Sequence, residues 1–157
     1  MKAATLREIK LALGDKSEKE LIELCLHLSR FKKESKELLT YLLFEEQDET
    51  SYINSVKVEM DELFESMNTS SYYYVNKTVR KVLRLTKKYI RYSKKKETEV
   101  ELLLHFCQSV KELHPSPNHN LALYNIYLRQ KAAISKILLS LHEDLQYDYQ
   151  QELDRLN

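Results

Sequence analysis

The amino-acid sequence predicts an all-α protein. Its 157 residues include one glycine and two prolines, too few for the many tight turns that an all-β fold requires. Apolar residues recur at alternating spacings of three and four, which is the period of amphipathic helices. We therefore expect a single helical domain over residues 1–157, with about six mostly antiparallel helices arranged as a bundle or a short helical array.

The first two helices are defined by their ends. Residues 5–13 form a short helix that stops at Gly14, where we expect the left-handed conformation common after helices. Ser17 and Glu20 have the spacing of a capping box at the start of a second helix. That helix covers residues 18–44, and its apolar stripe of about 25 residues would be about 37 Å long at 1.5 Å per residue. Its stripe is Leu21, Leu24, Leu28, Phe31, Ser35, Leu38 and Leu42.

Four more helices follow, separated by short polar breaks. An acidic loop over residues 45–50 precedes the third helix, and the fourth covers residues 72–93. The fifth begins near Glu97 and ends before Pro115, because a proline disfavours the helical conformation of its predecessor. Asn118 is expected to cap a long final helix over residues 118–155.

Each of these helices has a row of residues that we expect to be buried. On the third helix the row is Ile53, Val56, Met60, Leu63 and Met67, and on the fourth it is Val75, Val79, Val82, Thr86 and Tyr89. On the fifth it is Val100, Leu103, Leu104, Cys107 and Val110, and on the last it is Leu121, Tyr124, Leu128, Ile134, Leu138, Leu141, Leu145 and Tyr149.

The net charge of +1 conceals a strong segregation of charge along the chain. Residues 45–65 contain eight acidic residues and one lysine, whereas residues 66–96 contain ten basic residues and no acidic one. Residues 142–157 contain five acidic residues and one arginine. On the fourth helix the basic side chains fall on the side opposite the valines. Like charges four residues apart repel by roughly 0.2–0.5 kcal/mol per pair, so local stability does not explain this arrangement.

This cationic side of the fourth helix, over about residues 72–95, is the candidate docking surface for an anion or a partner. Three interpretations stay open. The surface binds the phosphates of a nucleic acid, with bases stacking on Tyr73, Tyr74 and Tyr92, or it binds an acidic protein or an anionic membrane. Alternatively, the acidic third helix or C-terminus neutralises it within one chain or a homodimer. The candidate residues are Lys77, Arg80, Lys81, Arg84, Lys87, Lys88, Arg91 and Lys95.

The sequence lacks the motifs of common enzyme classes. One glycine excludes a phosphate-binding loop, a dinucleotide fingerprint and a nucleophile elbow, each of which needs at least two glycines close together. Cys25 and Cys107 are expected to be buried free thiols. Residues two apart on a helix point in different directions, so neither cysteine can share a metal ion with the nearby His27 or His105. We expect no enzymatic activity, no metal site and no cofactor.

Two pairs of residues have the spacing of partners on one helix face. Glu23 and His27, and likewise Glu101 and His105, are four residues apart, and we expect each pair to be hydrogen-bonded. The sequence contains neither the apolar centre of a secretory signal nor a run of ~20 apolar residues that would span a bilayer. A cytoplasmic location is the expectation.

Two stretches of the chain, residues 5–31 and 79–108, resemble a family of uncharacterised small bacterial proteins. The first is a short charged helix followed by a serine-capped, leucine-rich helix, and the second is a basic helix followed by an apolar helix with an acidic start. The resemblance implies an all-helical bacterial cytosolic protein and carries over no catalytic or binding residue. We predict a non-enzymatic interaction or scaffold protein that binds an unknown protein or itself, with a homodimer as one form of self-association. The alternative is a nucleic-acid-binding protein.

Overall fold

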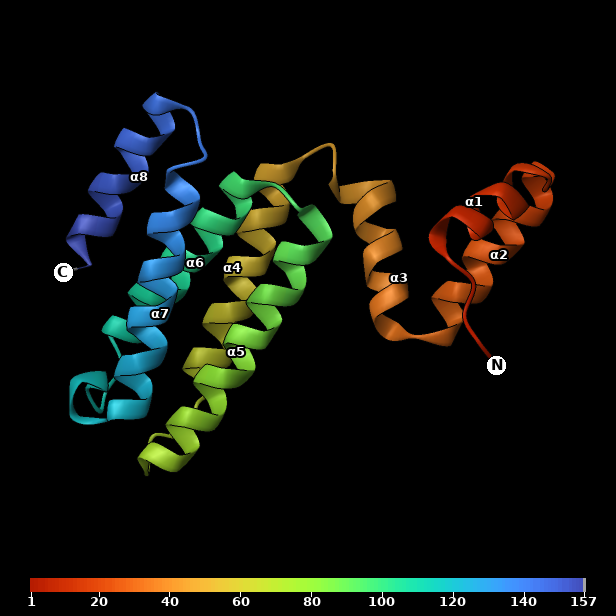
Figure 1. The fold of residues 1–157 in the computed structure, drawn as a ribbon. Helices are drawn as coiled ribbons and strands as arrows, with labels where there is room; N and C mark the ends of the chain where they lie inside the picture. Colours follow the sequence, from red (N-terminus) through yellow and green to blue (C-terminus); the bar gives the residue numbers. More distant parts are fainter. Residues whose placement is uncertain (157) are drawn as a thin grey trace. The chain divides into compact units, whose positions relative to one another are not determined.

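The computed structural model describes residues 1–156, which contain eight α-helices and no strand (Figure 1). The all-α prediction is confirmed, but the expected number of helices is too low by two because two expected helices are each divided. None of the described helices has the length and apolar content needed to cross a membrane. Contacts divide the chain into two compact units, residues 1–44 and residues 45–157. A single domain over residues 1–157 stays a prediction, and we describe each unit by itself.

Unit 1, residues 1–44, contains α1 (Leu6–Gly14), α2 (Glu18–Phe31) and α3 (Lys33–Thr40), followed by a short π-helical turn at Tyr41–Glu45. The predicted capping box at the start of α2 is confirmed, since the Ser17 hydroxyl accepts a hydrogen bond from the Glu20 N–H and the Glu20 carboxylate accepts one from the Ser17 N–H. Gly14 does not adopt the predicted left-handed conformation. A turn in which the Lys16 N–H donates to the Leu13 carbonyl at 3.1 Å closes α1 without it.

The predicted continuous helix over residues 18–44 is wrong. Lys32 is extended, with φ −140° and ψ 140°, and separates α2 from α3. The break allows α3 to pack against α2, so that Cys25 and Leu28 line an apolar groove with Leu38 and Leu42. This packing covers only part of α2, and Cys25 is exposed rather than buried as predicted.

Unit 2 is built around α6 (Lys96–Lys111), which contacts α4 (Glu49–Glu65), α5 (Tyr72–Ser93), α7 (Leu121–Leu138) and α8 (Glu143–Arg155). Because these helices surround α6 on several sides, Leu102 and Phe106 are buried as well as the five residues that we expected. Full burial of each large apolar side chain contributes about 1.5–3 kcal/mol. Those five residues are Val100, Leu103, Leu104, Cys107 and Val110.

The core faces of α4 and α5 agree with the predicted rows. Val75, Val79, Val82 and Thr86 of α5 are fully buried, while Tyr89 at the end of the row is half-buried. On α4, Ile53, Val56 and Met60 are buried, while Leu63 is half-buried and Met67 lies beyond the end of the helix and is also half-buried. The valine row therefore fixes the rotation of α5 and directs the opposite side of the helix toward solvent.

The last predicted helix, over residues 118–155, is two helices in the structure. α7 ends at Leu138 and α8 begins at Glu143. A 3₁₀ turn over Pro117–His119 precedes α7, and Asn120 rather than Asn118 caps it by accepting a hydrogen bond from the Leu123 N–H at 3.1 Å. The C-terminal end of α8 is tied to α7, since the Tyr127 hydroxyl donates to the Leu156 carbonyl at 2.5 Å.

The buried row of α7 also differs from the prediction. Of the expected row on this helix, Ile134 and Leu138 are buried, but Leu121, Tyr124 and Leu128 are exposed. Two helical rows along this sequence contain apolar residues, and packing against α6 selects one of them. The row that is buried consists of Leu123, Tyr127, Gln130, Ile134 and Leu138.

Candidate functional site

The basic side chains of the predicted docking surface lie on one long helix, α5. Six of them are exposed on the side opposite the buried valines, and we call these six residues the basic face. Among residues 45–156, no acidic side chain forms an ion pair with any of the six. The basic face consists of Lys77, Arg80, Lys81, Arg84, Lys87 and Arg91.

The other two predicted residues, Lys88 and Lys95, have partners within the chain. Lys88 is half-buried, with its Nζ atom 4.5 Å from the centre of the Tyr89 ring. Lys95 lies beyond the end of α5, and its Nζ atom is 2.8 Å from the Glu49 carboxylate. Glu49 also accepts hydrogen bonds from the hydroxyls of Ser93 and Thr98, so Lys95 belongs to a polar cluster that fixes the turn between α5 and α6.

A groove of about 930 Å³ between α5 and α7 adjoins the basic face. Lys77, Arg80 and Arg84 line it from α5, and Arg129 lines it from α7. None of the described residues that line the groove is acidic. Sequence reasoning missed Arg129, because only the packing of α7 beside α5 places its charge near the other three.

Asn76 contributes a second polar feature to this groove. Its Nδ2 atom donates to the Tyr72 carbonyl at 2.8 Å and to the Asn120 side chain at 3.3 Å. Its Oδ1 atom is buried and accepts no hydrogen bond from any described residue. A buried carbonyl oxygen without a partner costs roughly 1–3 kcal/mol of stability.

Two tyrosines lie at the N-terminal end of α5 beside the groove. The Tyr73 and Tyr74 side chains are 69% and 43% exposed, and their rings meet edge to face with centres 5.3 Å apart. Tyr73 also lines the groove. Tyr92, the third tyrosine that we expected at this surface, is buried and therefore cannot stack on a base.

Two acidic residues of α4 contact groups other than the basic face. Glu59 accepts a hydrogen bond from the Tyr89 hydroxyl at 2.6 Å, and the Asp61 carboxylate is 2.7 Å from the His105 Nε2 atom. One of the three interpretations was that the third predicted helix neutralises the basic face. Within unit 2, this helix forms no ion pair with the six basic side chains.

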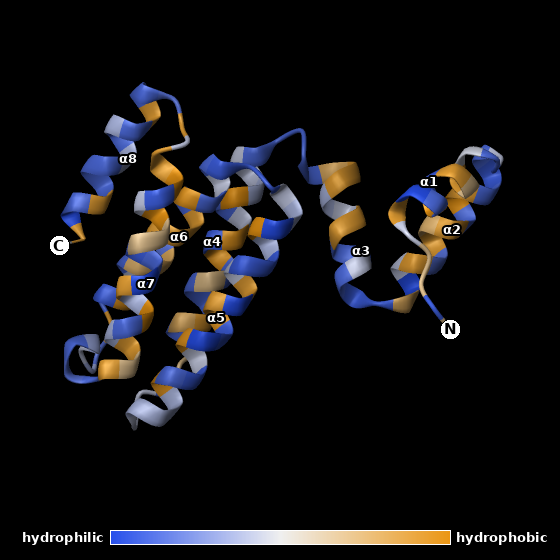
Figure 2. Ribbon diagram, viewed as in Figure 1, coloured by the Kyte–Doolittle hydropathy of each residue, from blue (hydrophilic) through white to orange (hydrophobic). Residues whose placement is uncertain are grey.

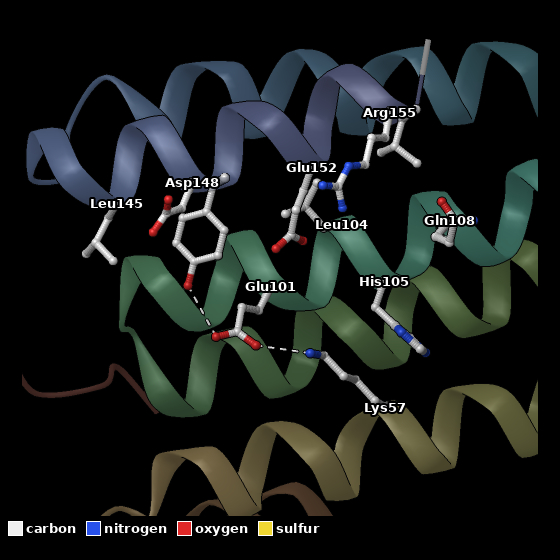
Figure 3. Close-up of a pocket in the computed structure, with 11 residues that line it drawn as sticks. Lys57, Glu101, Leu104, His105, Gln108, Leu145, Asp148, Glu152 and Arg155 are labelled. Atoms are coloured by element: carbon white, nitrogen blue, oxygen red, sulfur yellow. Dashed lines mark hydrogen bonds and ion pairs between the residues drawn. The ribbon is translucent and has the colours of Figure 1, made fainter.

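A polar pocket of about 560 Å³ lies between α4, α6 and α8 (Figure 3). In this pocket, the Glu101 carboxylate forms an ion pair with Lys57 at 3.0 Å and accepts a hydrogen bond from the Tyr149 hydroxyl at 3.2 Å. The predicted hydrogen bond between Glu101 and His105 is absent, since His105 contacts Asp61 instead. Burial and the nearby Glu101 carboxylate raise the pKa of Tyr149, so the phenol stays protonated and donates. Because both oxygens of Glu101 are engaged, this cluster links α4, α6 and α8.

The cysteine and histidine residues are dispersed. The described residues contain no group of three or more histidine, cysteine, aspartate or glutamate side chains that could hold a metal ion. Burial raises the pKa of the Cys107 thiol to about 12, which keeps it protonated and unreactive. Glu23 and His27 form no hydrogen bond with each other in the described part of the chain, contrary to the prediction.

Comparison with known proteins gives no match to a family model, to a curated protein or to a solved structure. The resemblance to the family of small bacterial proteins stays a prediction.

Proposed function

We propose that the protein is a non-enzymatic interaction module that binds a negatively charged partner on the basic face of α5. The observation that carries this proposal is the set of six exposed cations on one helix without an acidic ion-pair partner in unit 2.

The spacing of these cations suits an extended anionic partner. Lys77 and Arg91 are 14 residues apart in sequence, which corresponds to about 21 Å along the helix at 1.5 Å per residue. The repulsion between Arg80 and Arg84, and between Lys87 and Arg91, is relieved when an anion binds between them. Such binding is long-ranged and steered by charge, and it weakens as salt screens the interaction.

The two candidate partners are an acidic protein and a nucleic acid, and the groove between α5 and α7 favours the nucleic acid. Arginine binds phosphate through two parallel hydrogen bonds, and the groove offers three arginines, Arg80, Arg84 and Arg129, beside Lys77. The exposed ring of Tyr73 at the end of this groove offers a platform for an unpaired base, which favours a single strand over a duplex.

The experiment is a fluorescence anisotropy titration with three probes: a short single-stranded oligonucleotide, the matching duplex, and a polyglutamate peptide of similar charge. We expect at least one probe to bind at low salt. The Arg80→Ala/Arg84→Ala variant should bind it at least tenfold more weakly. The matched control, Lys96→Ala/Lys136→Ala, removes two exposed cations of unit 2 that lie off the basic face.

The outcomes separate the two candidate partners. Binding of polyglutamate alone identifies an acidic protein as the partner class, and preferential binding of the single strand supports the nucleic-acid function. Failure of all three probes at low salt would overturn the proposal, as would equal weakening by the two double variants.

A further inference from the structure

For its size, unit 1 exposes far more large apolar side chains than unit 2. None of α1, α2 and α3 contributes a buried residue. Apart from Met1, twelve large apolar side chains among residues 1–44 are exposed, compared with eight in the described part of unit 2, which has more than twice as many residues. Figure 2 shows hydrophobic residues along all three helices of unit 1. The twelve are Leu6, Ile9, Leu11, Leu13, Ile22, Leu24, Leu26, Leu28, Phe31, Leu42, Leu43 and Phe44.

The exposed apolar side chains of unit 1 are distributed over α1, α2 and the turn at Tyr41–Glu45. Exposed apolar surface of this kind on a protein marks sites of interaction with a partner. A segment of 44 residues is also close to the size below which a chain needs an oligomeric partner to form a core.

The charges around α2 favour a second copy of the same chain as the occupant. Residues 15–23, at its start, contain four acidic and two basic residues, whereas residues 30–36, at its end, contain four basic and one acidic. When two copies of α2 lie antiparallel, the acidic start of each meets the basic end of the other. A partner of one charge sign would instead meet like charge at one end.

The apolar residues of α2 have the spacing that such a contact needs. Leu21, Leu24, Leu28 and Phe31 follow the alternation of three and four that packs side chains of one helix between those of another. Leu24 is 41% exposed, Leu28 is 60% exposed and Phe31 is 75% exposed, so this stripe is available. The midpoint of α2 lies between Leu24 and Cys25.

We propose that unit 1 is a homodimerisation module in which α2 packs antiparallel against α2 of a second copy, about a two-fold axis close to Leu24. In such a contact the same surface serves both subunits, and the Leu24 side chains of the two subunits face each other. This inference does not depend on the proposed function. A dimer would present two basic faces, and this would strengthen its binding to any anionic polymer long enough to contact both.

Light scattering during size-exclusion chromatography, over a series of concentrations, tests the dimer. We expect twice the mass of one chain for the native protein and the mass of one chain for Leu28→Glu, with unchanged helix content by circular dichroism. The matched control is Leu121→Glu, at a leucine of unit 2 that is 74% exposed, and it should remain dimeric. The native protein at the mass of one chain throughout, or a dimer that Leu28→Glu leaves intact, would overturn the proposal.

Disulfide formation tests the antiparallel arrangement. In a Cys25→Ser background, Leu24→Cys should form a covalent dimer on mild oxidation, because the two thiols meet near the axis. Glu23→Cys, one residue away and 100° around the helix, is the control and should remain largely monomeric under denaturing electrophoresis. The native Cys107 is buried and does not compete. Equal cross-linking at both positions, or none at residue 24 in a protein that is dimeric, would exclude the proposed axis.

Discussion

The salt dependence of binding to the groove between α5 and α7 can be worked out from the residues that line it. Each phosphate that a cation neutralises on a single strand contributes about −0.7 to the slope of log K against log salt concentration. If Lys77, Arg80, Arg84 and Arg129 each neutralise one phosphate, the slope is about −2.8. An increase from about 50 to about 200 mM salt then weakens binding roughly 50-fold.

The perturbation is Arg80→Ala/Arg84→Ala, which removes two of the four cations. Both side chains are exposed and neither belongs to the core, so the fold should be unaffected. The slope should fall to about −1.4, and the same increase in salt should weaken binding only about sevenfold. The measurement is a set of anisotropy titrations with a labelled single strand at several salt concentrations.

The control for this prediction is Lys96→Ala/Lys136→Ala, which changes the net charge by the same amount. Its slope should stay near that of the native protein, because neither lysine lines the groove. An unchanged slope in the arginine variant, or an equal reduction in both variants, would refute the assignment of phosphate contacts to the groove.

Three further predictions concern the stability and titration of the fold. Hydrogen bonds from the Ser17 backbone and hydroxyl, together with Lys16, lower the pKa of Glu20 to about 2. The cap of α2 therefore stabilises the helix above about pH 4.5, and this stabilisation is lost as the pH falls toward 2. In an NMR titration, Ser17→Ala should raise the pKa of Glu20, and an unchanged pKa would contradict the cap. A thiol reagent should modify Cys25 at once and Cys107 only after unfolding, and equal reactivity of the two would contradict their different burial. Phe106→Ala should lower the free energy of unfolding by roughly 3–5 kcal/mol in urea titrations, because this ring is fully buried, and a loss below about 1 kcal/mol would contradict that burial.

The sequence was informative wherever one helix face had a single chemical character. α5 has valines on one side and cations on the other, so only one rotation of the helix buries apolar residues, and Val75, Val79 and Val82 are buried as predicted. On α6 the five expected residues are buried, but Leu102 and Phe106 were missed, because four helices surround α6 and bury more than one of its faces.

The sequence was uninformative where the pattern permits two arrangements. The stripe of α2 continues into α3 without a glycine, a proline or a capping side chain at Lys32, and only the packing of α3 against α2 shows that the chain turns there. Likewise α7 has two apolar rows, and the choice between Leu121 and Leu123 depends on which row meets α6. The sequence also did not identify Arg129 as part of the candidate site, because the residues that surround it in the groove belong to another helix, α5.

The near-zero net charge of the chain is the strongest argument for neutralisation of the basic face within the molecule, and the contacts in unit 2 weaken that argument. Glu49 is occupied by Lys95 and two hydroxyls, Glu59 by the Tyr89 hydroxyl, and Asp61 by His105. These acidic groups act within the helix contacts of unit 2, where they satisfy buried or half-buried polar partners. These three acidic groups therefore form no ion pair with the basic face in unit 2, and we expect a partner of opposite charge to bind there.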